Sequence, residues 1–217
     1  MKKKINCILF DLDGTLIKSG PDLLDSLNYV LIKNQIPEIP KDIIGNLVGG
    51  GAANMILKAY NYYKIDIEKK KLEILVNEFL DFYSFNCSKK TLPYETVSTT
   101  LDALLLKKII MCVCTNKKQY LAEKILSDLN LNKYFKIILG SNPKLKLKPD
   151  CEMLKFLIRK IGVNTDNILM VGDSENDIIP SNLLGIKSVF VNYGYGKIIN
   201  SKPTFTIQNF NQILDLI

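Results

Sequence analysis

Two aspartates, Asp11 and Asp13, follow a short apolar run over residues 5–10 and precede Gly14 and Thr15. Such a run is typical of a buried strand, so both carboxylates should emerge at its carboxyl end, where open α/β sheets bind their ligands. A carboxylate in that place can act as a nucleophile, as a general acid or base, or as a metal ligand. The same residues can also form a simple Asp-Gly turn, so the motif needs support from elsewhere in the chain.

A second polar group, Thr115 and Asn116, ends another apolar run over residues 109–115 and precedes a helical pattern that starts near Gln119. A threonine at that place can cap the helix. It can equally offer its hydroxyl and nearby backbone N–H groups to a phosphate. The sequence alone leaves both interpretations open.

A third candidate is Lys148, which precedes Pro149. The residue before a proline is held extended, and Pro149 suits the first position of a helix over residues 151–160. Lys148 is therefore expected to be more restrained than an ordinary surface lysine, which is the alternative interpretation.

The fourth group contains Asp173 and Asp177 and directly follows an apolar run over residues 168–171. The chain has no histidine, which excludes Ser-His-Asp hydrolysis, histidine phosphatases and histidine-ligated metals. Acidic clusters without imidazole or thiolate suit a hard, oxygen-preferring cation such as Mg²⁺. We therefore expect a magnesium site at this strand end.

These four groups imply a particular set of elements to position them. Apolar, often β-branched runs recur along the chain with helical patterns between them, which indicates a parallel sheet covered by helices on both faces. The runs lie at residues 5–10, 109–115, 137–139, 168–171, 188–192 and 204–207. The four polar groups would then share one edge of a single sheet.

A long interval with mainly helical spacing separates the first two runs. We therefore expect residues 17–86 to form an inserted helical cap domain, and residues 1–16 and 87–217 to form the catalytic core. Turn-rich segments at residues 19–21 and 88–93 bracket the insertion. We interpret these segments as hinges and the insertion as a mobile lid.

The composition excludes several classes of function. The net charge is +7, but Arg159 is the only arginine, and because nucleic-acid recognition prefers arginine we expect no nucleic-acid partner. The apolar stretch before Asp11 is too short for an export signal, and no window reaches the length of a membrane helix. We expect a cytoplasmic protein without membrane association, whose five cysteines are mostly buried thiols rather than disulfides.

Together the four groups resemble the motifs of the haloacid dehalogenase superfamily, whose members have a Rossmann-like parallel α/β core. The resemblance covers essentially the whole chain, because the helical insertion is similar to the type C1 cap of that family. Within the superfamily the chain is most similar to the phosphoglycolate phosphatases. The stretches that carry this similarity are residues 10–17, 48–51, 184–189 and 192–195.

The resemblance implies a role for each acidic residue. Asp11 would attack phosphorus to give an aspartyl-phosphate, while Asp13 would protonate the leaving oxygen and later deprotonate the hydrolytic water. Mg²⁺ would be held by the carboxylates of Asp11 and Asp173 and by the backbone carbonyl of Asp13. Asp177 would lie in the outer shell of the metal.

The resemblance also implies how the phosphate is held. Lys148 would neutralise Asp11 and the transferring phosphoryl group, and Thr115 would hold the equatorial oxygens of that group. The residues implied to contact substrate are Gly14, Thr15, Asn116, Gly49, Gly50 and Gly51. The last three precede a helix start and suit a carboxylate, although a flexible connection between cap helices is the alternative.

The expected reaction is the hydrolysis of a small phosphate ester, with 2-phosphoglycolate as the substrate and a monomer or homodimer as the working form. Alternatives on the same core are a sugar-phosphate phosphatase and a β-phosphoglucomutase-like enzyme, and a catalytically silent interaction protein is the alternative from another class. The chain departs from the family pattern at Lys18, at Glu95 in the second connection, and at Cys151. The first two departures lie at the connections to the expected cap, so they bear on the substrate rather than on the core chemistry.

Overall fold

The computed structural model describes residues 4–217, which form two compact units. We call them the sheet unit, Met1–Lys18 with Pro93–Ile217, and the helical unit, Ser19–Leu92. The division therefore falls after residues 18 and 92, whereas the sequence suggested 16 and 86.

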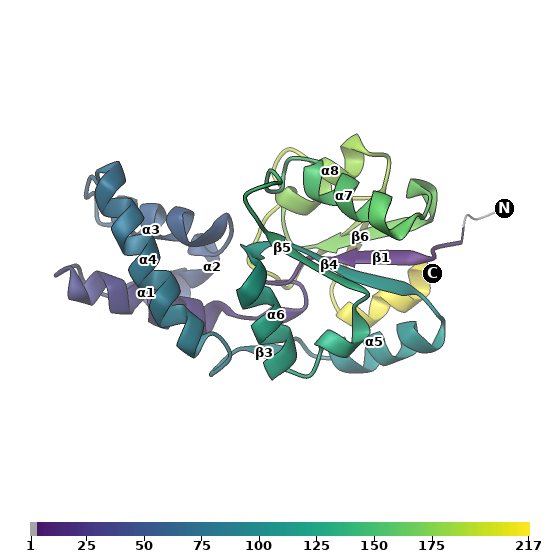
Figure 1. The fold of residues 1–217 in the computed structure, drawn as a ribbon, viewed down its shortest axis with the longest axis horizontal. Helices are drawn as coiled ribbons and strands as arrows, with labels where there is room; N and C mark the ends of the chain where they lie inside the picture. The colour runs from purple at the N-terminus through teal and green to yellow at the C-terminus, as the bar shows by residue number, and fades with distance from the viewer. Residues whose placement is uncertain (1–3) are drawn as a thin grey trace. The chain divides into compact units, whose positions relative to one another are not determined.

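The sheet unit is built on six parallel strands in the order β5-β4-β1-β6-β7-β8. Strand β1 lies in the middle of the sheet (Figure 1), and Phe10 at its end is level with Val113 of β4 and Val171 of β6. All six expected strands are confirmed, and so is the parallel α/β fold. Their bounds are β1 Cys7–Phe10, β4 Ile110–Lys118, β5 Ile137–Ser141, β6 Ile168–Gly172, β7 Lys187–Val191 and β8 Phe205–Ile207.

Helices cover both faces of this sheet, as its near-continuous apolar strands require. Figure 1 shows α7 (Glu152–Ile161) and α8 (Glu175–Leu183) on one face, with α5 (Val97–Leu106) and α6 (Gln119–Asp128) on the other. Side chains alternate between the faces along each strand. Cys7, Cys112 and Cys114 belong to one buried cluster with residues of α7. These cysteines are free, which confirms that they are core thiols.

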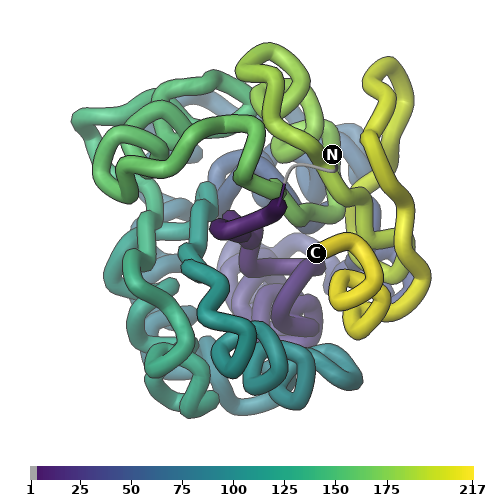
Figure 2. The backbone as a smooth tube through the Cα atoms, turned by 90° about the vertical axis from the view of Figure 1, so that its right-hand side faces the viewer, coloured from purple at the N-terminus to yellow at the C-terminus, as the bar shows by residue number. Residues whose placement is uncertain are grey.

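The chain ends within the sheet unit, in the 3-10 helix η4 (Phe210–Leu216) that packs on α5 (Figure 2). Phe210 is buried against Phe10 of β1, with 5.7 Å between the ring centroids. The terminal segment thus completes the core behind the central strand. The remaining short elements of this unit are η2 Asn132–Tyr134 and η3 Thr165–Asn167.

The helical unit consists of α1, α3 and α4 with two short helical turns. Helices α1 and α3 both pack on α4, which buries Leu75, Phe79 and Tyr83 along one stripe. The helices expected from the spacing are confirmed. Their bounds are α1 Gly20–Lys33, η1 Lys41–Ile43, α2 Ile44–Leu47, α3 Gly51–Tyr62 and α4 Lys69–Asn86, while the short strands β2 Ile17–Lys18 and β3 Leu92–Pro93 form a separate two-stranded sheet. Within residues 4–217, none of the helices combines the length and the apolar character needed to cross a membrane.

One buried carboxylate explains why the helical unit extends beyond α4. Asp22, in the first turn of α1, is 1% exposed and accepts hydrogen bonds from the backbone N–H groups of Lys90 and Thr91 and from the Thr91 hydroxyl. Residues 87–92 are therefore tied to α1. The sequence does not reveal these hydrogen bonds, because they join residues far apart in the chain.

The helix expected over residues 151–160 is confirmed as α7, but the place predicted for Pro149 is not. Pro149 was expected at its first position, but the helix begins at Glu152 and the Lys148–Pro149 peptide bond is cis. The Asp150 side chain accepts a hydrogen bond of 2.9 Å from the backbone N–H of Glu152. The N-cap of the helix is Cys151, and Pro149 belongs to the preceding turn.

We predict that Asp22→Asn lowers the free energy of unfolding by about 2 kcal/mol. The asparagine amide keeps one acceptor oxygen, but its NH2 group is a donor and would face backbone N–H groups that now donate to the carboxylate. Urea denaturation measures this change. Asp25→Asn is the matched control, since Asp25 lies on the same helix but forms only an exposed ion pair with Lys90. Equal effects of the two substitutions would show that Asp22 does not hold this segment.

Candidate active site

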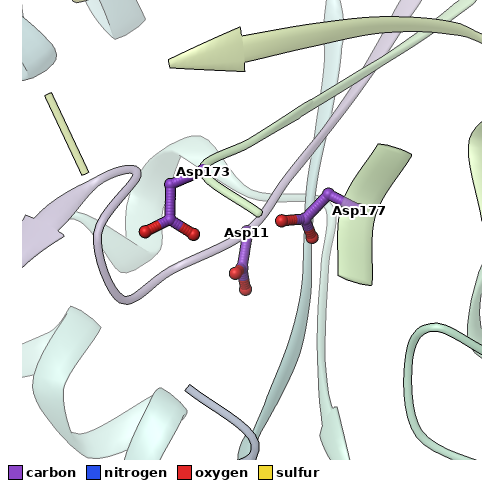
Figure 3. A group of neighbouring side chains, drawn as sticks. All are labelled: Asp11, Asp173 and Asp177. Atoms are coloured by element: carbon purple, nitrogen blue, oxygen red, sulfur yellow. The ribbon is translucent and has the colours of Figure 1, made fainter. Parts of the chain in front are cut away.

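Three carboxylates converge at the carboxyl ends of β1 and β6. Asp11 directly follows β1, Asp173 follows β6, and Asp177 lies in the first turn of α8. One ligand atom from each lies within 4.8 Å of the others, and Figure 3 shows the three side chains next to one another. The structure thus brings together acidic residues that the sequence separates by more than 160 positions, 173 minus 11 being 162.

Asp11 is held at the centre of this group. Its backbone N–H donates to the carbonyl of Val171, at 2.9 Å, which fixes the chain at the point where β1 ends. Its Oδ1 is buried and accepts no hydrogen bond from any residue that the structure describes. Burial raises the pKa of Asp11 to about 6, against the opposing charge of Lys148. The ammonium of Lys148 lies 3.1 Å from Oδ1, so an ion pair rather than a hydrogen bond holds it.

Asp173 is enclosed by a loop that the sequence analysis gave no role. Its Oδ2 accepts hydrogen bonds from the backbone N–H groups of Tyr195, at 2.8 Å, and Gly196, at 3.0 Å. A Cβ on Gly194 would lie 2.3 Å from the Cβ of Asp173, and one on Gly14 would lie 2.1 Å from its Oδ2. Glycine is therefore required on both sides of this carboxylate.

The charge of Asp173 is costly in this setting. Burial, together with the neighbouring charges of Asp11 and Asp177, raises its pKa to about 7. Without a cation, the site therefore disfavours ionisation of both Asp11 and Asp173 near neutral pH.

Lys148 supplies the positive charge between these carboxylates. Its Nζ donates to the carbonyl of Cys114 and to Oδ1 of Asp177, both at 2.6 Å, and lies 3.1 Å from Oδ1 of Asp11. Burial acts to lower the pKa of Lys148, but the charges of Asp11 and Asp177 raise it above its ordinary value. Lys148 is thus a permanent cation, as its predicted role requires.

The structure gives Asn116 a different task from the predicted contact with substrate. Its side-chain amide donates to the carbonyl of Lys148, at 2.7 Å, and accepts from the N–H of Lys148, at 2.9 Å. Both polar atoms of the amide thus hold the Lys148 backbone. Asn116 positions the lysine that the sequence treated as an independent motif.

Asp177 is occupied by the protein on both oxygens. Oδ1 accepts from Lys148, while Oδ2 accepts from the backbone N–H and the hydroxyl of Ser174 in a capping box at the start of α8. With its oxygens engaged in this way, Asp177 can orient the lysine and the helix. Its expected place in the outer shell of a metal stays a prediction.

Asp13 is paired with Lys117, a residue of the Thr115-Asn116-Lys117 stretch to which the sequence assigned no role. Nζ of Lys117 lies 2.9 Å from each carboxylate oxygen of Asp13. Lys117 stands two residues after Thr115 on β4, so the two-residue period of a strand places both side chains on the same side. That alternation was the one signal in the sequence that could have found it.

The remaining predicted contacts divide by location. Thr115 is buried at the same strand ends, and its Oγ1 accepts from the N–H of Lys117 at 3.2 Å. Thr15 is fully buried, and its backbone carbonyl accepts a hydrogen bond from the hydroxyl of Tyr193; its contact with substrate stays a prediction. Gly49, Gly50 and Gly51 belong to the helical unit, where all three have positive φ and α3 begins at Gly51.

The donor set suits a hard divalent cation. Asp11, Asp173 and Asp177 offer only oxygen, and no imidazole is available because the chain has no histidine. The Asp11 carboxylate and the Asp173 carboxylate, whose Oδ2 already accepts two backbone hydrogen bonds, offer ligand atoms within 4.8 Å of each other. These residues therefore fit a divalent cation that prefers oxygen ligands.

Comparisons with known proteins agree with this geometry. The family model for haloacid dehalogenase-like hydrolases matches residues 8–191. The phosphoglycolate phosphatase of Agrobacterium fabrum is 32% identical over 204 residues, which cover 93% of this chain and 88% of that protein. The phosphoglycolate phosphatase of Haemophilus influenzae (strain 86-028NP) is 31% identical over the full length of both chains. The crystal structure of a predicted phosphoglycolate phosphatase from Haemophilus somnus is similar with a TM-score of 0.89 and 30% identity, over 98% of this chain and 97% of that one.

We predict that cation binding strengthens by about tenfold or more between pH 5.5 and pH 8, because Asp11 and Asp173 must lose protons that their raised pKa values of about 6 and about 7 retain. Raised carboxyl pKa values stabilise the cation-free fold at low pH, and this stabilisation is lost as the pH rises through them. The increase in melting temperature on adding Mg²⁺ should therefore be larger at pH 8 than at pH 5.5. An increase that does not depend on pH would contradict this account.

We predict that Gly194→Ala weakens Mg²⁺ binding by about tenfold, because the added methyl group must displace the Asp173 side chain or the loop that holds it. Isothermal titration calorimetry of the purified variant measures the affinity. Gly45→Ala is the control, since a Cβ there meets no atom within 4 Å. Wild-type affinity in Gly194→Ala would mean that the loop does not position Asp173.

Proposed function

This chain belongs to the haloacid dehalogenase-like hydrolases, and we propose that it is a Mg²⁺-dependent phosphatase of the cytoplasm that hydrolyses 2-phosphoglycolate through a phosphorylated Asp11. The observation that carries the proposal is the setting of Asp11. It combines a strand-end carboxylate, a permanent cation 3.1 Å from its Oδ1 and two further carboxylates in one cluster. This setting suits attack by an oxygen anion on the phosphorus of a phosphoryl group whose oxygens also carry negative charge.

In the proposed first step, an oxygen of Asp11 attacks phosphorus and the ester oxygen leaves. Lys148 offsets the charge of Asp11 and of the phosphoryl group, because its ammonium lies between Asp11 and Asp177 and stays charged. Thr115, buried at the adjacent strand end, would bind the phosphoryl oxygens. Bound Mg²⁺, held by Asp11, Asp173 and the Asp13 carbonyl with Asp177 behind them, would supply the charge neutralisation that lets a carboxylate approach a phosphate dianion.

Asp13 serves as the acid and base of the proposed cycle. It lies two residues after the nucleophile, so a proton from its carboxyl group can reach the leaving oxygen during the first step. In the second step the same carboxylate removes a proton from the water that hydrolyses the aspartyl-phosphate. Two easier steps thus replace one difficult displacement.

The choice of substrate rests on the relatives and on the helical unit. The proteins of A. fabrum and H. influenzae are named phosphoglycolate phosphatases, and the alignments cover nearly all of this chain. We propose that the sheet unit carries the catalysis and that the helical unit is the cap that selects the ester. The glycines that precede α3 expose backbone N–H groups at a helix amino terminus, which favours a carboxylate such as that of phosphoglycolate. We further propose that the working form is a monomer or a homodimer.

A screen of small esters tests the proposal. Phosphate release with Mg²⁺ is measured for 2-phosphoglycolate, a sugar phosphate, pyrophosphate, a nucleotide and p-nitrophenyl phosphate, and we predict the highest kcat/KM for 2-phosphoglycolate. Asp11→Asn should lower every rate by at least about a thousandfold, because a carboxamide is not a competent nucleophile. A preference for another ester would overturn the substrate, and transfer of the phosphoryl group to a sugar would indicate a mutase. Full activity of Asp11→Asn would overturn the mechanism.

A further inference from the structure

Lys117 forms an enclosed ion pair with Asp13 that the proposed chemistry does not by itself explain. Its Nζ lies 2.9 Å from both carboxylate oxygens, and the side chains of the lysine and the aspartate are 5% and 19% exposed. Removing two charges from water costs free energy that their attraction does not fully return. The pair is therefore a poor device for stability, and its position beside the nucleophile suggests a functional reason.

The lysine stands on a rigid support. Strand β4 continues through Lys118 and pairs with β5 on either side of Lys117, at Cys114 and at Lys118, with a shift of register between these two residues. A Cβ on Gly140 would lie 2.8 Å from the carbonyl oxygen of Lys117, so β5 packs directly on the backbone that carries the lysine. A group on a paired strand is placed more precisely than one on a free loop.

The backbone on the Asp13 side is equally restrained. The N–H of Gly14 donates to the carbonyl of Ile17, at 3.0 Å, and Asp13 forms a β-bridge with Ile17. The carbonyl of Thr15 is held by the Tyr193 hydroxyl. With the backbone fixed, the main freedom left to Asp13 is rotation of its carboxylate, and a single ammonium that contacts both oxygens removes that freedom.

The direction in which the carboxylate is held also matters. The acidic side chains whose ligand atoms cluster within 4.8 Å are Asp11, Asp173 and Asp177, and Asp13 is not a member of that cluster. We propose that Lys117 is a positioning residue that fixes the Asp13 carboxylate for proton transfer and keeps it apart from the cation ligands. This inference rests on the proposed function, in which Asp13 is the acid and base.

The test compares two leaving groups in purified full-length variants. An alkyl ester, 2-phosphoglycolate or whichever alkyl ester the wild type prefers, needs a proton on its leaving oxygen, whereas p-nitrophenolate leaves as a stable anion. Because kcat/KM covers only the steps up to phosphorylation of Asp11, it isolates this difference. We expect Lys117→Met to lower kcat/KM for the alkyl ester by about tenfold or more, and for p-nitrophenyl phosphate by less than about threefold.

A double-mutant cycle with Asp13→Asn shows whether Lys117 acts through Asp13. If it does, Lys117→Met should cause no further loss for the alkyl ester once Asp13 is already asparagine. Lys118→Met is the matched control, because it removes the same charge from the exposed neighbouring position, and we expect it to leave both rates unchanged. Lys117→Gln, which can donate to one oxygen of Asp13, should show an intermediate loss and serves as the test if the methionine variant does not fold.

The outcomes separate this inference from the proposed function. Three outcomes would overturn the positioning role: equal losses for both esters, additive losses in the cycle, or a rate for the alkyl ester that is unchanged or increased in Lys117→Met. In each case, loss of activity in Asp13→Asn would leave the proposed function standing. If the wild type hydrolyses neither ester, or if Asp13→Asn retains full activity, the proposed acid and base fails, and the role of Lys117 falls with it.

Discussion

The structure depends on one electrostatic constraint, which is that three carboxylates must share a small, largely dry volume. Burial raises the pKa values of Asp11 and Asp173, and repulsion from Asp177 adds to this effect at both. Lys148 is the only cation whose ammonium contacts members of this cluster within residues 4–217, and one positive charge cannot balance three negative ones. The site is therefore built with a deficit of positive charge, which a divalent cation would correct.

The fold meets this constraint by using the ends of adjacent strands. Strands β4, β1 and β6 are neighbours in the sheet and parallel, so their carboxyl ends lie on one edge. Lys148 reaches this edge from the segment after β5. The side-chain amide of Asn116, on β4, holds the Lys148 backbone by one hydrogen bond to its carbonyl and one from its N–H. Backbone pairing places the charges, and hydrogen bonds from other loops then fix their directions. Catalytic geometry is thus a product of the sheet rather than of any one motif.

The sequence predicted the features that depend on neighbouring residues, and it missed those that depend on packing. The six strands and the strand-end location of Asp11 follow from short apolar runs, which is why they were predicted. The pairing of Lys117 with Asp13 joins residues 104 positions apart, and no local pattern encodes it. The enclosure of Asp173 by residues 194–196 is similarly distant. The place of Pro149 was predicted wrongly for another reason, since its preference for the first position of a helix is only a local tendency, and here Pro149 lies in the turn before α7.

The environment of Lys148 also sets its chemical reactivity. An ammonium has three hydrogens, and here two are donated to Cys114 and Asp177 while Asp11 lies near the third. Acylating reagents attack only a neutral amine with a free lone pair, and a buried, permanently protonated amine offers none. The chain has 28 lysines, since Arg159 is the only arginine among its 29 basic residues. Lys148, which the proposed reaction needs, is thus shielded from the electrophiles that modify exposed lysines. The arrangement that suits Lys148 to neutralising phosphate also makes it a poor nucleophile, so an enzyme rich in reactive surface amines can carry an inert one at its centre.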